Sequence, residues 1–191
     1  ATRTFNDAAN YEFYGGAAVT NTSFPNSVMN NLTISNTAGV TQGGAITVNG
    51  NLTIASGAAF TTSANAIGLK GNWVNNGGTL TTSNTVTLNG TSAQSYTNTG
   101  TNPFNNLTLN NANGLLLNNN LNVGSALTLT AGKVTMGANN VTTGSISGSS
   151  TAYLITDGVG QFNITPPSAA TTIFPVGVSA SSYDPVSVNP T

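Results

Sequence analysis

Catalysis in this chain would depend on its carboxylates, because it contains no histidine and no cysteine. Without those residues, Ser-His-Asp triads, thiol nucleophiles and the usual zinc sites cannot be assembled. The remaining options are paired carboxylates for glycoside hydrolysis or an acidic calcium site. Only four acids are present, and two of them stand beside turn residues, where Asp often makes local hydrogen bonds: Asp7, Glu12, Asp157 and Asp184. We therefore expect no catalytic residue, metal ligand or cofactor, and no enzyme.

The scarcity of charge also limits the partners. Charged residues make up 4% of the chain and the net charge is −1, against about 25% charged residues in ordinary globular proteins. Three isolated cations, Arg3, Lys70 and Lys133, cannot neutralise a run of phosphates, so nucleic-acid binding is not expected. Attraction to an anionic membrane surface fails for the same reason, and no apolar run reaches the roughly 18 residues of a spanning helix.

Two aromatic residues are candidates for binding an uncharged ligand. Trp73 and Tyr96 could offer ring faces on which a sugar stacks. The alternative, which we favour, is that both rings pack in the core or at a corner of the fold. Because the surface is otherwise rich in Asn and Thr, surface glycans or other copies of the chain are the expected partners.

The elements that would carry these residues follow from a repeat. The motif Asn-Leu-Thr-Ile at 31–34 returns at 51–54, and related segments occur at 85–88, 106–109 and 126–129. In each segment two apolar residues flank a threonine, which is the alternation of a half-buried strand. With a weaker copy at 69–74, the step is about 17–21 residues, a period typical of solenoids. One short strand per step predicts an all-β, right-handed parallel β-helix in which each coil stacks on the next.

Alternation predicts which side chains face inward. Ten apolar residues should form ladders in a narrow core: Leu32, Ile34, Leu52, Ile54, Val86, Leu88, Leu107, Leu109, Leu127 and Leu129. The intervening threonines should form an outward ladder, namely Thr33, Thr53, Thr87, Thr108 and Thr128. A regular Thr face is also found on some ice-binding β-helices, although Thr is equally favoured at outward strand positions for its shape and its cross-strand hydrogen bonds. Clusters of Asn and Gly between strands should form the corners.

A longer repeat, spanning about four coils, suggests the domain organisation. One shift of the sequence against itself places Tyr11-Glu-Phe on Val86-Thr-Leu and Asn31-Leu-Thr on Asn106-Leu-Thr, and it aligns many other positions. Residues 1–23 are therefore expected to be the end of a preceding repeat or an N-terminal coil, and 24–150 the β-helix. The longer repeat fails in 151–191, which we expect to be a β-rich cap or the start of a sandwich, with a hairpin turn at Asp157-Gly158.

These segments together resemble repeats in very large surface and secreted proteins of Bacteroidota. The resemblance rests on Asn-Tyr-Glu-Phe-Tyr-Gly-Gly at 10–16, on 28–40, 46–54 and 104–115, and on 153–160, 174–177 and 182–186. It implies export through the type IX secretion route, attachment at the cell surface or release, and roles in adhesion, gliding or fibre formation. The chain itself shows neither a signal peptide nor a type IX sorting signal.

The sequence thus predicts a non-catalytic, structural and adhesive segment of a large extracellular protein, cut from a longer repetitive rod. The alternative is a β-helix that binds or degrades polysaccharide, and a further one is ice binding through the Thr ladder.

Overall fold

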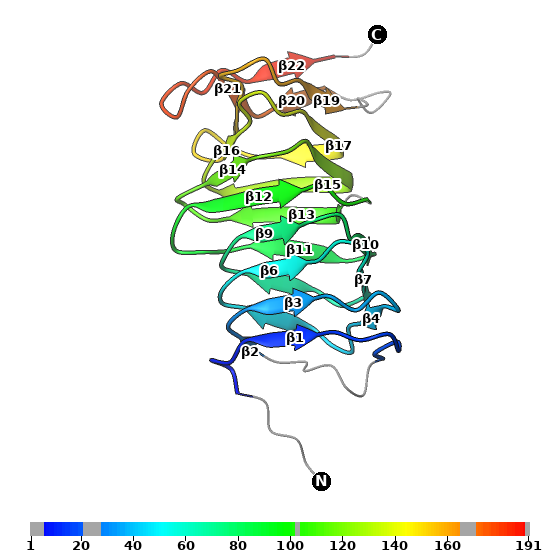
Figure 1. Cartoon of the computed structure of the whole chain (residues 1–191). Coiled ribbons are helices and arrows are strands. Elements are labelled where there is room, and N and C mark those ends of the chain that lie inside the picture. The colour runs from blue at the N-terminus through cyan, green and yellow to red at the C-terminus, as the bar shows by residue number, and fades with distance from the viewer. Residues whose placement is uncertain (1–5, 21–27, 102–103, 165–170, 190–191) are drawn as a thin grey trace.

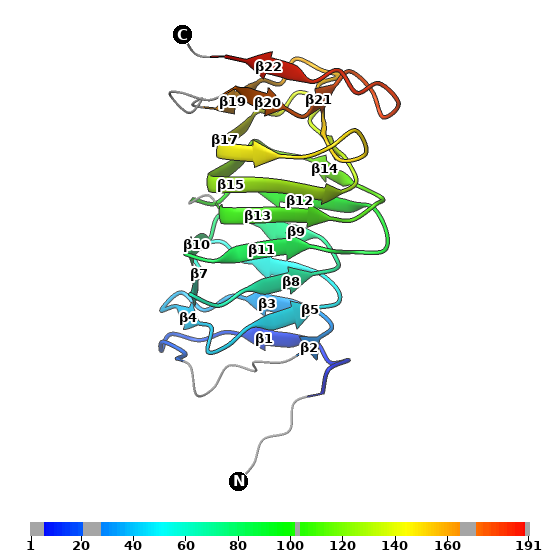
Figure 2. The ribbon, with the colours of Figure 1, turned by 180° about the vertical axis from the view of Figure 1, so that it is seen from behind.

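The structure, a computed structural model, describes residues 6–20, 28–101, 104–164 and 171–189, and every regular element in these ranges is a β-strand. No helix in this part of the chain is long and apolar enough to cross a membrane. The strands stack into a solenoid whose axis runs from the N-terminal to the C-terminal end (Figure 1). The front strands point right as the chain rises, and the back strands run the opposite way (Figure 2), so the coil is right-handed.

Two long parallel sheets form opposite walls. The front sheet consists of β1 (Tyr11–Phe13), β3 (Leu32–Ile34), β6 (Leu52–Ile54), β9 (Trp73–Asn75), β12 (Gln94–Asn98), β14 (Leu115–Leu117), β16 (Val134–Thr135), β18 (Leu154–Ile155) and β21 (Val176–Gly177). The back sheet consists of β2 (Val28–Met29), β5 (Ile46–Val48), β8 (Ile67–Leu69), β11 (Thr85–Leu88), β13 (Phe104–Asn110), β15 (Leu121–Ala131), β17 (Val141–Ser147) and β19 (Phe162–Ile164). The predicted all-β parallel solenoid is therefore confirmed.

A third, shorter sheet closes one side of the lower half only. This side sheet contains β4 (Val40–Thr41), β7 (Ala59–Ser63) and β10 (Thr79–Thr82), again in parallel pairing. The lower coils thus have three walls and the upper coils two.

The coils differ in length. One full turn carries the chain from Leu32 to its partner Leu52 in the lower half, from Trp73 to Tyr96 in the middle, and from Leu115 to Val134 in the upper half. The middle turn is longer than the step predicted from the repeat, whereas the other two fall within it. Because the strands themselves stay in register, the difference lies in the corner loops.

The ten apolar residues that alternation assigned to the core are all buried, with exposed fractions of 4% or less. They pair in register with like residues on neighbouring coils, as Leu32 does with Leu52 and Leu107 does with Leu127. Burial of such ladders is the main favourable term in the stability of the fold.

The Asn-Leu-Thr-Ile copies do not form one ladder, however. The copies at 31–34 and 51–54 lie in the front sheet, as β3 and β6, whereas those at 85–88, 106–109 and 126–129 lie in the back sheet, within β11, β13 and β15. The long gap between Leu52 and Val86 spans one full coil and the further passage from front to back. Because alternation marks only which side of a strand is buried, it does not show which wall the strand belongs to.

The longer repeat changes its fold between its two copies. In the first, Ile46–Val48 and Leu52–Ile54 are separate strands on different walls, joined by the corner Asn49-Gly50-Asn51. The corresponding positions of the second copy form the single strand β15, whose register with β13 and β17 shifts at Val123 to Ala126. A bulge of this kind bends a strand without ending it.

The solenoid extends past the boundary expected at residue 150. β18 and β21 continue the front sheet and β19 continues the back sheet. The predicted hairpin at Asp157-Gly158 is therefore wrong, since the strands on either side of it lie in different sheets. Among the strands of the described ranges, only β20 (Thr172–Phe174) and β22 (Val186–Val188) pair antiparallel, and they lie across the C-terminal end (Figure 1). At the other end β1 already pairs with β3, while 1–5 and 21–27 lie outside the described residues.

The first corner of each lower coil is held by a ladder of asparagines. The side-chain Oδ1 of Asn10, Asn31, Asn51 and Asn72 accepts a hydrogen bond from the backbone N–H of the following coil, at 3.2, 2.7, 2.8 and 2.8 Å. The last of these N–H groups belongs to Ser95. The other three N–H groups lie just before β3, β6 and β9, and Ser95 is the second residue of β12, so each asparagine satisfies a backbone donor where the chain enters the front sheet.

A second type of corner contains buried amides. Asn111 is 1% exposed; its Nδ2 donates to the Ser92 carbonyl and to Gln94 Oε1, at 2.7 and 2.9 Å, and its Oδ1 accepts from Asn113 N. Gln94 in turn donates to the Leu69 carbonyl. This network ties three successive coils together inside the wall.

Leu107 and Leu116 allow one substitution to be compared inside and outside the core. Leu107 is fully buried, whereas Leu116 is 49% exposed on the front sheet. Leu107→Ala should lower the free energy of unfolding by about 2–5 kcal/mol, because it leaves a cavity in a packed core. Leu116→Ala should cost less than about 1 kcal/mol. Urea denaturation followed by circular dichroism measures both, and equal losses would contradict the assigned burial.

Asn111 and its neighbour Asn110 give a matched test of the buried amide network. Asn111→Ala removes three hydrogen bonds: Ser92 O and Asn113 N lose their Asn111 partner, and Gln94 Oε1 keeps only the Gly90 N–H. We expect the free energy of unfolding to fall by about 1–3 kcal/mol, the usual cost of an unsatisfied buried polar group. Asn110 is exposed, so Asn110→Ala should change it by no more than about 0.5 kcal/mol. If the denaturant midpoints shift equally in the two variants, the buried amide network does not contribute measurably to stability.

Candidate functional site

The structure does not gather the acids into a site. Glu12 Oε1 accepts a 2.6 Å hydrogen bond from Ser35 Oγ, and Asp184 Oδ2 accepts one of the same length from Ser182 Oγ. Asp157 Oδ1 accepts from the Gly137 backbone N–H at 3.3 Å. Glu12 lies in β1, the first strand of the front sheet, whereas Asp157 follows β18, the eighth of its nine strands. Within the described ranges, no three residues of the His, Cys, Asp or Glu types are grouped so as to hold a metal ion.

The two candidate stacking residues lie in the core. Trp73 is 1% exposed and Tyr96 3% exposed, and they are paired in register on β9 and β12. Phe104 packs against both, with ring centroids 4.7 Å from Trp73 in an edge-on arrangement and 5.8 Å from Tyr96. Neither residue presents a ring face to solvent, so the predicted sugar-stacking platform is absent, and the preferred alternative of core packing describes the geometry.

The predicted Thr ladder is divided between the two walls. Thr33 and Thr53 are paired on the front sheet, in a row that begins at Glu12 and continues to Val74. Thr87, Thr108 and Thr128 are paired on consecutive strands of the back sheet. All five are half-buried. The ladder thus consists of two short rows that face away from each other, because the motif copies lie on different walls.

The side sheet carries a further threonine row that the sequence analysis did not single out. Thr41, Thr61 and Thr81 are paired across β4, β7 and β10. Beside this row, Thr79 pairs with Ala59 and its hydroxyl lies 3.4 Å from that of Thr101. Among the described strands of this wall, β10 alone therefore offers two outward threonines side by side. The signal was present as Phe-Thr-Thr and Leu-Thr-Thr, but it lay outside the repeated motif.

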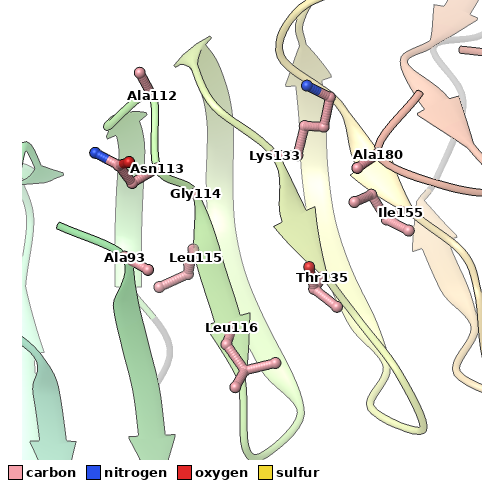
Figure 3. Close-up of a pocket in the computed structure, with 10 residues that line it drawn as sticks. All are labelled: Ala93, Ala112, Asn113, Gly114, Leu115, Leu116, Lys133, Thr135, Ile155 and Ala180. Carbon is pink, nitrogen blue, oxygen red and sulfur yellow. The ribbon is translucent and has the colours of Figure 1, made fainter. Parts of the chain in front are cut away.

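The upper front sheet contains a hollow of about 290 Å³ (Figure 3). Its floor includes outward residues of the paired strands β14, β16 and β18, namely Leu116, Thr135 and Ile155. The next strand down, β12, carries Ser95 at the position that pairs with Leu116, whereas two of these three outward residues are aliphatic. The sequence did not reveal this change, because Leu115-Leu116-Leu117 reads as an uninterrupted apolar run in which the exposed residue cannot be recognised.

The rim of this hollow is made of small residues and one cation. It is lined by Ala93, Ala112, Asn113 and Ala180, and Lys133 lies at its upper end (Figure 3). The Lys133 ammonium lies 5.2 Å from the centre of the Tyr153 ring, a favourable cation–π distance. The hollow can therefore accept a small apolar group with a negative charge beside it. We refer to it below as the front groove, defined by Leu116, Lys133, Thr135, Ile155 and Ala180.

Comparisons with protein families, curated proteins and solved structures gave no match. The function is therefore argued from the arrangement of the sheets and their surfaces.

Burial of Tyr96 predicts a dependence of stability on pH. Burial raises the pKa of the Tyr96 phenol well above its ordinary value, while unfolding restores a pKa near 10. The stability associated with this buried phenol is therefore complete below about pH 10 and is lost as the pH rises above it.

Tyr96→Phe should consequently make stability less dependent on pH between about pH 9 and 11. Tyr14→Phe, at a residue that is 76% exposed, should leave that dependence unchanged. Denaturant midpoints measured at several pH values give the slopes, and a Tyr96→Phe slope identical to that of the unmodified chain would contradict the prediction.

Proposed function

We propose that this chain is a non-catalytic, structural and adhesive segment of a large extracellular bacterial protein, in which it acts as a stiff spacer. The observation that carries the proposal is the continuity of the two walls. Parallel pairing runs from Tyr11 in β1 to Gly177 in β21 on the front sheet, and from β2 to β19 on the back sheet. A rod in which each coil bonds to the next holds its two ends at a fixed separation.

The composition of the walls supports an adhesive role. Their outward rows contain many Thr, Ser and Asn residues, interrupted by Glu12 and Val74 and, in the upper front sheet, by Leu116 and Ile155. Such faces can form hydrogen bonds and methyl contacts with a polysaccharide or another surface, each of them weak. Many copies displayed together would gain avidity from repetition. The resemblance of the sequence to repeats in surface and secreted proteins of Bacteroidota supports the same proposal, with export by the type IX route.

The alternative of a polysaccharide-binding or polysaccharide-degrading β-helix is less well supported. It requires exposed aromatic rings or paired acids, and Trp73 and Tyr96 are buried. A monovalent sugar site would therefore depend on other residues.

Bead adhesion separates the two functions. Beads coated densely with the chain should adhere to a polysaccharide-coated surface, with less than about a twofold change between roughly 0.05 and 0.5 M NaCl, because uncharged contacts are not screened. Adhesion should fall steeply as the coating density is lowered, since it depends on many weak contacts.

The soluble chain is the control for this measurement. It should show no saturable binding to short oligosaccharides at micromolar concentration and should release no reducing ends from the polysaccharide. Tight binding of the single chain, or hydrolysis, would replace the adhesive proposal with the carbohydrate-directed one. Adhesion lost at the higher salt concentration would contradict both the uncharged mechanism and the proposed role of the Thr and Asn faces.

A further inference from the structure

We propose that the front groove receives the loop 157–160 of a second copy of this chain, so that the rods associate side by side. The inference rests on two complementary surface features and does not depend on the proposed function. One feature is the groove, which combines exposed aliphatic surface with a cation. The other is a loop that combines the most exposed large apolar side chain among the described residues with a carboxylate.

The loop holds its apolar side chain away from the rod. Val159 is 85% exposed, between Gly158 and Gly160. A Cβ at either glycine would collide with backbone of the coil below, at Gly137 and Asn139 respectively. Gly160 N also donates to Gly137 O at 3.1 Å. The two glycines therefore allow the loop to lie close against the coil below, and the Val159 side chain between them is exposed.

The charges of the two features are opposite. Asp157 is exposed, two residues before Val159, and its Oδ1 accepts only a long hydrogen bond from Gly137 N. In the groove, Lys133 lies over the Tyr153 ring. The exposed Leu116 and the floor residue Ile155 line the same groove, on either side of Thr135 (Figure 3). A valine inserted against these aliphatic residues would bring an aspartate two residues away towards the ammonium.

The position of the two features along the axis also matches. All front strands run in the same direction, so their first residues lie along one edge of the sheet and their last residues along the other. Lys133 immediately precedes β16, and Asp157 follows β18, which pairs directly with β16. Lys133 and the loop therefore lie at opposite edges of the front sheet and differ in height by about one coil, roughly 5 Å, and the groove extends from the Lys133 edge over Thr135 and Ile155. A sideways shift of one copy, with the axes kept parallel, brings the loop of one rod to the Lys133 edge of the groove on the next.

Such a contact is heterologous, because different patches of the two copies meet. Heterologous contacts related by a shift do not close, so they produce open rows and not dimers. A single loop in a hollow of about 290 Å³ buries far less surface than a stable interface of roughly 1,600 Å². Association in solution should be weak, with a dissociation constant on the order of millimolar, and should become effective where many rods are held on one surface.

Mixed disulfide formation tests the arrangement directly, because the chain has no cysteine of its own. Val159→Cys and Ala180→Cys place one thiol on the loop and one at the groove. In an equal mixture under mild oxidation, random collision gives about half of the cross-linked product as the 159–180 pair. A heterologous contact should raise the ratio of that pair to the two symmetric products by about fivefold or more.

Charge reversal in the same assay identifies the contact. Lys133→Glu or Asp157→Lys alone should lower the yield of the 159–180 pair by about three- to fivefold, the effect expected of an exposed ion pair. The two reversals in the same chain should restore it, which a variant that merely failed to fold could not do. Lys70→Glu, at an exposed lysine away from the groove, should have no effect. The proposal would be overturned by a random product distribution, or by a yield of the 159–180 pair that neither Lys133→Glu nor Asp157→Lys lowers.

Discussion

The structure depends on hydrogen bonds that run along the axis, from each coil to the next. Strands of two to four residues are too short to be stable as isolated pairs, yet here most are paired on both sides within sheets of nine and eight strands. The difficulty lies at the corners, where the backbone leaves the sheet and its donors lose their partners. The asparagines solve this problem, because Oδ1 of Asn31 or Asn51 accepts from the backbone of the following coil. The abundance of Asn in the sequence is thus a consequence of turning the chain several times per coil.

Alternation was sufficient to predict the class of fold and its core. Every apolar residue placed inward by the pattern is buried, from Leu32 at one end to Leu129 near the other. The pattern could not show the number of walls, because a corner such as Asn49-Gly50-Asn51 and a bulge at Gly124-Ser125 both interrupt alternation in a similar way. Whether such an interruption turns the chain or only bends it is decided by pairing with the coils above and below. The split of Thr33 and Thr53 from Thr87, Thr108 and Thr128 follows from this ambiguity.

The candidate surface was predicted less completely than the core, for a related reason. Outward positions are recognised only relative to inward ones, and an exposed leucine between two buried leucines leaves no signal in the sequence. Leu116 could therefore be identified only from the paired strands. Conversely, Trp73 and Tyr96 were candidate binding residues because the chain has few aromatic residues, but the scarcity of a residue type does not indicate whether its side chain is exposed. Large aromatic side chains are also well suited to filling a wide core, and Trp73 and Tyr96 both do so here.

The aromatic cluster explains how one solenoid can contain two cross-sections. β10 is the last strand of the side sheet, and above it the front and back walls face each other directly. At this change the space enclosed by a coil differs from that of its neighbours, and the gap must be filled if the ladders above and below are to stay in register. Trp73, Tyr96 and Phe104 meet there, in contact across successive coils. From Phe104 onward the back strands β13, β15 and β17 are 7, 11 and 7 residues long, while the front strands β16 and β18 have two residues each. A front wall of short strands leaves corner residues such as Ala93 and Ala112 to define its edge, and the front groove lies on this narrowed wall. The groove therefore lies in the part of the solenoid that has two walls, above the aromatic residues that fill the core where the third wall ends.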